Sequence, residues 1–108
     1  MSRKCRVTQS AKTDILECYN WYEEKIPGLG ASCVEELDAT FEQVTLHPHS
    51  WAEAYPGIRR AIVNVYPYLV FFAVEDSEVV VLAVVPAAQD PEFVRRKIAA
   101  LDQFGSYT

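Results

Sequence analysis

The sequence has few of the residues that build metal and redox sites. It contains three cysteines, Cys5, Cys18 and Cys33, and two histidines in the stretch His47-Pro48-His49. No Cys-x-x-Cys pair is present and the histidines have no third ligand nearby, so neither a zinc site nor a redox pair is predicted. Three free thiols are typical of a protein of the reducing cytoplasm. Two of them fall within predicted helices, where we expect them to pack in the core.

Long apolar runs are also missing. The longest run has seven residues, and the first fourteen residues, MSRKCRVTQSAKTD, contain no apolar stretch. A membrane-spanning helix needs about 20 apolar residues, and a secretory signal needs an apolar segment near its start. We therefore expect a cytoplasmic protein that does not associate with membranes.

Positive charge is scarce. Ten lysines and arginines stand against fifteen aspartates and glutamates, giving a net charge of −5, and residues 14–53 hold nine acidic residues and one lysine. Affinity for nucleic acid comes mainly from lysine and arginine contacts to phosphate. The composition therefore predicts no direct nucleic-acid binding.

What the sequence does contain is the pattern of one globular domain over residues 1–108, half of it apolar. Apolar residues recur at spacings of three and four in two stretches separated by the sequence PGLG, which predicts two helices joined by a short turn. We place the first from Ala11, with Ser10 as its cap, and the second from Ala31 to Leu46. A third helix is predicted from Pro91 to about Phe104, capped by Asp90.

Strands are predicted around the helices. The segments YLVFFAV and VVVLAVV are apolar throughout, as in strands covered on both faces. The acidic turn EDSE between them makes them antiparallel, and residues 49–57, HSWAEAYPG, are predicted to be a loop. The predicted strands are residues 3–9, 58–65, 68–74 and 79–85. The order β-α-α-β-β-β-α predicts an α+β fold with an antiparallel sheet packed against an N-terminal helical hairpin.

Four stretches follow one another along the chain: DILECYNWYEEKIPGLG (14–30), ELDATFEQVTLHP (36–48), IRRAIVNVYPYLVFFAVED (58–76) and VVVLAVVPAAQDP (79–91). In this order they are similar to the RelE/ParE superfamily, the toxins of type II toxin–antitoxin or plasmid stabilisation systems. The hairpin with WYEE and PGLG resembles the ParE side more closely. The resemblance implies a small cytoplasmic growth inhibitor held inactive by a cognate antitoxin, acting on DNA gyrase if ParE-like or on ribosome-bound mRNA if RelE-like.

The sequence departs from the family pattern after the last strand. Many members have His-x-x-Arg-Asp there, and the matching residues in this chain are Pro86-Ala87-Ala88-Gln89-Asp90. RNA cleavage needs groups that transfer protons and stabilise a developing negative charge, and this segment supplies none. Ribonuclease activity is therefore disfavoured, and no catalytic residue and no cofactor is predicted. Arg59 and Arg60 match the family's basic position at the start of the middle strand.

Several residues are candidates for binding a target or partner. The predicted set comprises Trp21, Arg59, Arg60, Tyr68, Gln89, Arg95 and Arg96. Exposed tryptophans commonly anchor protein interfaces, whereas each of these residues also has an ordinary alternative role in packing or as a solvated surface group. Neighbouring strand residues point to opposite faces, so only one of Arg59 and Arg60 can enter a given groove.

The predicted function is a toxin that binds a protein target, with DNA gyrase the leading candidate, and that a cognate antitoxin neutralises. Two alternatives stay open: a RelE-like mRNA interferase acting on the ribosome, and a non-toxic family member that serves only as a binding partner. A homodimer and a hetero-oligomer with the antitoxin are both compatible with the sequence.

Overall fold

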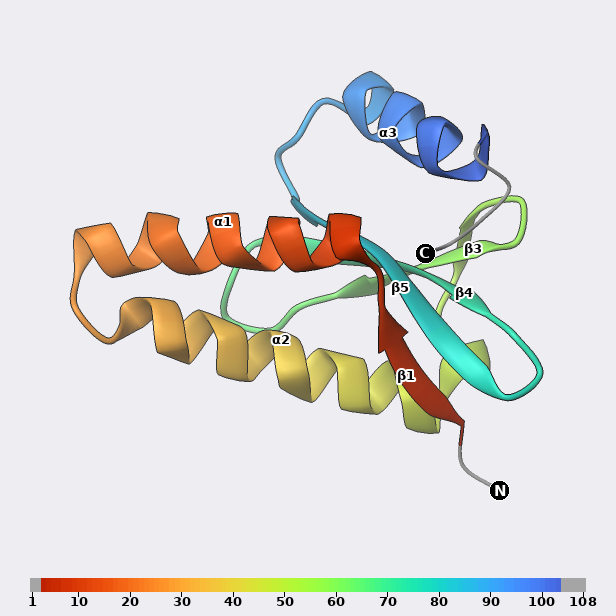
Figure 1. The fold of residues 1–108 in the computed structure, drawn as a ribbon, viewed down its shortest axis with the longest axis horizontal. Coiled ribbons are helices and arrows are strands. Elements are labelled where there is room, and N and C mark those ends of the chain that lie inside the picture. The colour runs from red at the N-terminus through yellow and green to blue at the C-terminus, as the bar shows by residue number, and fades with distance from the viewer. Residues whose placement is uncertain (1–2, 104–108) are drawn as a thin grey trace.

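The computed structural model describes residues 3–103, which form one antiparallel helical hairpin, a five-stranded sheet and a C-terminal helix (Figure 1). The elements are β1 (Lys4–Val7), α1 (Gln9–Lys25), α2 (Leu29–Leu46), the 3₁₀ helix η1 (Pro48–Ser50), β2 (Glu53–Tyr55), β3 (Ile58–Ile62), β4 (Tyr68–Val74), β5 (Glu78–Pro86) and α3 (Pro91–Gln103). The sheet order is β1-β5-β4-β3-β2, with β1 parallel to β5 and the other pairs antiparallel. The predicted α+β class is confirmed, with one strand more than expected.

The first helix begins two residues earlier than the sequence suggested, and its cap is Thr8 rather than Ser10. Thr8 has an extended backbone, and its hydroxyl accepts a hydrogen bond from the backbone N–H of Ala11 at 3.1 Å. The same residue donates its backbone N–H to the carbonyl of Val81 on β5. Thr8 therefore ends β1 and starts α1 at once, which leaves Ser10 inside the helix.

The tip of the hairpin is held by Glu23. Its carboxylate accepts hydrogen bonds from the backbone N–H groups of Gly28 and Gly30, at 2.9–3.1 Å. Gly28 has φ 93°, a left-handed conformation that favours glycine. Because Gly28 starts the second helix, α2 begins at Leu29, two residues before the predicted Ala31. Figure 1 shows the tip extending past the edge of the sheet.

The segment predicted as a loop, residues 49–57, instead contains the end of η1 and the edge strand β2. Strand β2 pairs with β3 through an irregular register between Glu53 and Tyr55. A turn at Gly57, with φ 75°, joins the two strands, and the backbone N–H of Gly57 donates to the carboxylate of Glu53. A three-residue strand is too short to show an alternating pattern, which explains why the prediction was wrong.

Strand β3 ends at Ile62, three residues before the predicted end. Val65 has φ 72°, which breaks the extended conformation, and the backbone N–H of Tyr66 donates to the carbonyl of Asn64. The chain therefore turns over residues 63–67 before entering β4, which runs over the predicted residues. The last helix starts at Pro91 as predicted, while its expected end at Phe104 lies outside the described residues.

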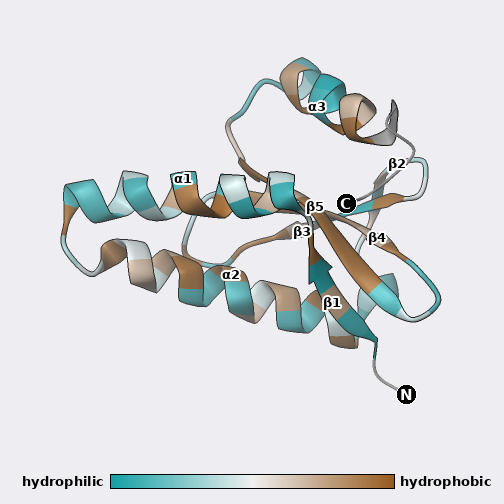
Figure 2. Cartoon of the chain, viewed as in Figure 1, coloured by the Kyte–Doolittle hydropathy of each residue, from teal (hydrophilic) through white to brown (hydrophobic). Residues whose placement is uncertain are grey.

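The two central strands are covered on both faces, as their composition predicted. One cluster, on the hairpin side, contains Leu37, Val70 and Phe72, and the other, on the α3 side, contains Phe71 and Leu82. A bulge in β5 accommodates Leu82, because Phe72 pairs with Val81 and Phe71 pairs with Ala83. Figure 2 shows β5 coloured hydrophobic over most of its length, whereas the helices carry both hydrophilic and hydrophobic bands.

Candidate functional site

A cavity of about 410 Å³ opens between α1 and the C-terminal end of β5, next to the segment where many family members carry reactive groups. Its lining combines acidic, aromatic and apolar side chains. The lining residues are Asp14, Glu17, Cys18, Trp21, Tyr22, Pro67, Tyr68, Val84 and Pro86. We call this cavity the α1–β5 pocket. None of the residues lining it carries a positive charge.

Asp14 forms the floor of the pocket and joins three elements. Its side chain is 8% exposed. One carboxylate oxygen accepts a hydrogen bond from the backbone N–H of Val84 at 2.9 Å, and the other from the ammonium of Lys97 on α3 at 2.6 Å. Strand β4 pairs with this part of β5 on one side, but β1 ends at Val7 opposite Val81, so among the described residues no strand pairs with Val84 on the other side. Asp14 therefore satisfies a sheet-edge donor that would otherwise be buried without a partner.

Tyr68 lies inside an aromatic cluster at the back of the pocket. The ring of Tyr22 packs edge-on against Tyr68, with centroids 6.2 Å apart, and against Tyr66 at 4.9 Å. Burial and the neighbouring Cys18 thiol raise the pKa of Tyr68 well above its ordinary value. Its hydroxyl therefore stays protonated at neutral pH and does not serve as a base. The predicted binding residue Tyr68 is mainly a packed wall of the pocket.

Trp21 stands at the mouth of the pocket and is 56% exposed. The ammonium of Lys25 lies 3.9 Å from its ring centroid, a cation–π contact one helical turn away. An indole that keeps more than half of its surface in water while lining a cavity has free area to offer a partner. The structure thus places Trp21 where an interface anchor would be useful.

The segment after β5 contains backbone contacts and a helix cap. The backbone N–H groups of Ala87 and Gln89 donate to the carbonyls of Pro67 and Pro86, and the carboxylate of Asp90 accepts from the N–H of Glu92 at the start of α3. Gln89 is half-buried. Pro86 lies where the family pattern has histidine, and it supplies neither a proton donor nor a nucleophile.

Arg59 and Arg60 do not line this pocket. The guanidinium of Arg59 donates to the backbone carbonyl of Trp51 at 2.7 Å, so Arg59 fastens the η1–β2 segment to β3. Arg60 is exposed, and strand alternation places it on the face opposite Arg59. Of the pair, Arg60 alone is exposed enough to offer its charge freely to an anionic partner.

Arg95 and Arg96 are exposed on α3. Arg95 forms an ion pair with Glu92 one turn earlier, and its hydrogen bond lowers the pKa of that carboxyl. Such a pair at the surface contributes little to folding. These arginines therefore form a separate basic surface on α3.

A second hollow, of about 470 Å³, lies between α2 and β3. Most of its lining residues are polar, and Trp51 and Ile62 add apolar surface. In the part of the chain that the structure describes, the Trp51 indole N–H is a buried donor without a hydrogen-bond partner. No group of three histidine, cysteine or acidic residues within residues 3–103 could hold a metal ion. Both histidines are exposed.

The predicted site residues are thus only partly brought together. Trp21 and Tyr68 share the α1–β5 pocket, Gln89 lies just beyond Pro86, and the arginines lie elsewhere. The sequence analysis missed Asp14, although a signal existed: Asp14 falls between Ala11 and Cys18 at core spacings of three and four. An acidic residue in such a position has to be paired or hydrogen-bonded.

Comparison with solved structures supports the fold. The chain superposes on a protein from the "Chromosomal ParDE TA system from P. aeruginosa" with a TM-score of 0.71 and 19% identity, covering 79% of this chain and 96% of the other. A mutant of the E. coli toxin RelE in the free state matches with a TM-score of 0.67 and 16% identity, covering 94% and 99%. Comparison with curated protein sequences gives no match. Among the described residues, no helix is both long and apolar enough to cross a membrane.

The sequence itself settles the family. A profile described as "ParE toxin of type II toxin-antitoxin system, parDE" matches residues 5–91, which include the hairpin, strands β2 to β5, all but the first residue of β1, and the segment after β5. The resemblance expected from the four sequence stretches is therefore confirmed. This chain belongs to the ParE toxin family of type II toxin–antitoxin systems.

Proposed function

We propose that this toxin acts in the cytoplasm by binding a protein target, with DNA gyrase the leading candidate, and that a cognate antitoxin neutralises it. Membership in the ParE family supports the target class and the antitoxin partner. The observation that carries the binding mechanism is the α1–β5 pocket, which is acidic and aromatic where a nuclease of this fold would need bases, acids and cations.

The chemistry of the pocket disfavours RNA cleavage. A nuclease has to accept a proton from the 2′-hydroxyl, stabilise the negative charge that develops at phosphorus and protonate the leaving oxygen. Pro86 and Gln89 perform none of these tasks, and Asp14 already accepts two hydrogen bonds. The exposed carboxylate of Glu17 would repel a phosphate rather than hold it.

The same pocket is suited to a protein side chain. Trp21 offers an exposed aromatic surface in the same pocket as the exposed carboxylate of Glu17. Aromatic residues and arginine are the commonest anchors at interfaces, and a basic or apolar side chain from the target would find both an aromatic contact and opposite charge here. Trp21 is therefore the residue we assign to target binding.

The antitoxin has a different surface available. Ile62, which lines the hollow between α2 and β3, is 62% exposed; Val65, in the turn that follows β3, is 84% exposed; and Leu46, at the end of α2, is 53% exposed. Antitoxin tails that fold on binding cover extended surfaces of this kind. We propose that the antitoxin tail packs over this side of the hairpin and sheet.

Growth measurements test the proposal. Induction of the chain alone should arrest growth, and co-expression with the antitoxin should restore it. Trp21→Ala should weaken the arrest at unchanged thermal stability. Leu16→Ala is the matched control, because Leu16 is similarly exposed, at 58%, and lies on the opposite face of α1 from the pocket.

Three outcomes separate the alternatives. Normal growth on strong induction of folded protein contradicts a live toxin, and tight antitoxin binding in that case identifies a partner that has lost toxicity. Arrest accompanied by cleavage of ribosome-bound mRNA, lost in an Arg59→Ala, Arg60→Ala double variant, identifies an mRNA interferase. Arrest with intact mRNA supports the binding mechanism.

A further inference from the structure

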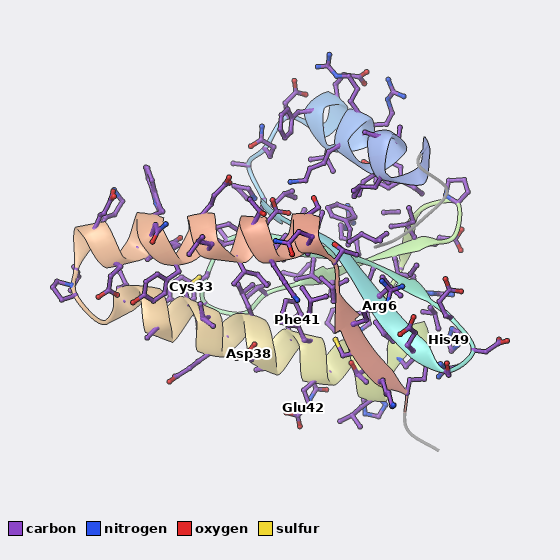
Figure 3. The ribbon with its side chains drawn as sticks, in the orientation of Figure 1. Arg6, Cys33, Asp38, Phe41, Glu42 and His49 are labelled. Carbon is purple, nitrogen blue, oxygen red and sulfur yellow. The ribbon has the colours of Figure 1, made fainter. Side chains whose placement is uncertain are left out.

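Two cysteines that are far apart in sequence meet inside the helical hairpin. Cys18 on α1 and Cys33 on α2 are 2% and 0% exposed, and their sulfur atoms lie 2.8 Å apart. Both are free thiols in this structure. Figure 3 shows the side chain of Cys33 between the two helices. A redox pair was not predicted from the sequence, because Cys18 and Cys33 are too far apart along the chain to form a recognisable motif.

The helices approach closely beside this pair because of Gly30. A methyl group at Gly30 would lie 2.6 Å from the backbone carbonyl oxygen of Tyr19 and 2.9 Å from its ring. Helix pairs usually keep their axes about 8–10 Å apart, whereas a disulfide needs Cα atoms within about 7 Å. Because glycine has only a hydrogen atom as its side chain, Gly30 lets the two helices come as close as a disulfide requires.

Both cysteines are buried, but Cys18, unlike Cys33, lines the α1–β5 pocket. Burial and the neighbouring Cys18 raise the pKa of Cys33 to about 12, so Cys33 is rarely a thiolate near neutral pH. Because it borders the pocket, Cys18 is the thiol that we expect a small oxidant to meet first, with Cys33 as the resolving thiol.

We propose that Cys18 and Cys33 are a redox-reactive pair that a hydroperoxide converts to an intramolecular disulfide linking α1 to α2. The Cys18 thiolate attacks one peroxide oxygen, which breaks the O–O bond and gives a sulfenic acid and, for hydrogen peroxide, water once the released hydroxide takes up a proton. Cys33 then attacks the Cys18 sulfur, the S–O bond breaks, and a second water leaves. In total two thiols lose two hydrogens and one peroxide becomes two waters.

The bond would alter the hairpin and the pocket together. It closes a loop that contains the hairpin tip, so the two helices can no longer separate. Cys18 lines the same pocket as Trp21 and Tyr22. Oxidation would therefore hold α1 against α2 close to Trp21, the residue assigned to target binding. The sulfur atoms need to move only about 0.8 Å to reach the bonded distance of about 2.05 Å.

Mass spectrometry of the full-length protein treated with hydrogen peroxide tests the inference. We expect a monomer about 2 Da lighter that thiol reductant reverses. Tryptic digestion should yield a cross-link between peptides 13–25 and 26–59, which contain Cys18 and Cys33. The oxidised protein should melt roughly 10 °C higher than the reduced one, because the closed loop restricts the unfolded chain.

Variants separate this pair from the exposed Cys5. Cys5→Ser should form the cross-link as the parent does, and Cys33→Ser and Cys18→Ser should not. The cross-link between peptides 13–25 and 26–59 is measured on the wild-type protein, so the test does not depend on whether the variants fold. Dimers linked through Cys5 without an internal cross-link, sulfinic acid at Cys18 with free Cys33, or a cross-link that forms only in urea each overturn the proposal.

Discussion

Replacing Asp14 with alanine tests the physical account of the pocket and of how α3 is held. The change removes the only two hydrogen bonds that the structure shows for this carboxylate, to the backbone N–H of Val84 and to Lys97. Both lie at the junction of α1, β5 and α3. Asp14→Ala should therefore destabilise the whole domain rather than one helix.

The magnitude follows from burial. A buried backbone N–H left without an acceptor costs about 1–3 kcal/mol. Lys97 is 24% exposed, so water replaces part of its lost partner, and that loss adds about 1 kcal/mol. Asp14→Ala should cost about 3 kcal/mol in total, which corresponds to a fall in Tm of roughly 10–20 °C for a domain of this size.

Urea unfolding of four variants resolves the two contributions. Lys97→Met leaves the buried Asp14 carboxylate without its cation and should cost about 3 kcal/mol or more. Asp14→Asn removes the charge but keeps an oxygen for Val84, and should cost about 1 kcal/mol. Glu17→Ala, an exposed carboxylate in the same helix, should change stability by less than about 0.5 kcal/mol. If Asp14→Ala costs no more than Asp14→Asn, the bond to Val84 contributes nothing and the reasoning is refuted.

Three further predictions concern the hairpin and β3. Gly30→Ala should destabilise the protein by about 2 kcal/mol, since the new methyl group meets a main-chain carbonyl. Gly57→Ala places its methyl group in open space but has a left-handed backbone, and should cost about 1 kcal/mol. If urea unfolding gives the same cost for both variants, the tight helix contact at Gly30 is contradicted. The pKa of Cys33 is raised to about 12 in the folded protein, whereas the thiol of an unfolded chain ionises at about pH 8.5. The contribution of Cys33 to folding stability is therefore fully present below the unfolded pKa and is lost as the pH rises toward 12. Cys33→Ala should flatten this alkaline loss, and an unchanged pH profile would contradict it. Arg59→Ala should lower stability by about 1 kcal/mol, because it removes the hydrogen bond to the Trp51 carbonyl. Arg60→Ala should leave stability within about 0.5 kcal/mol of the parent. If urea titrations show that Arg60→Ala costs more than Arg59→Ala, the structural role given to Arg59 is contradicted.

Much of the fold could be predicted because it depends on strong local patterns. Strand β4 begins and ends as its seven apolar residues indicate, and Asp90 and Pro91 mark the start of α3. Strand β2 was missed because three residues show no period. The cap at Thr8 was missed because the backbone N–H of that residue also donates to Val81 on β5. This contact with the sheet ends β1 at Val7, and the helix starts at Gln9, two residues earlier than predicted.

The site was harder to predict, because its parts meet only after folding. The sequence shows that Pro86 and Gln89 replace reactive residues, and that Trp21 lies off the core stripe of its helix. It does not show that Asp14 reaches a sheet edge left open where β1 ends, since that depends on the length of β1. The contact between Cys18 and Cys33 depends in the same way on how closely two helices approach.

The supercoiling activity of purified DNA gyrase, measured while the purified chain is titrated in, tests the central claim most directly. The account predicts that the parent protein and Leu16→Ala inhibit supercoiling, that Trp21→Ala inhibits it at least tenfold less well (about 1.4 kcal/mol of binding energy), and that the antitoxin restores activity. Full supercoiling at saturating amounts of folded protein, from a chain that still arrests growth, would contradict gyrase as the target. Equal inhibition by the parent and Trp21→Ala would contradict the α1–β5 pocket as the binding surface.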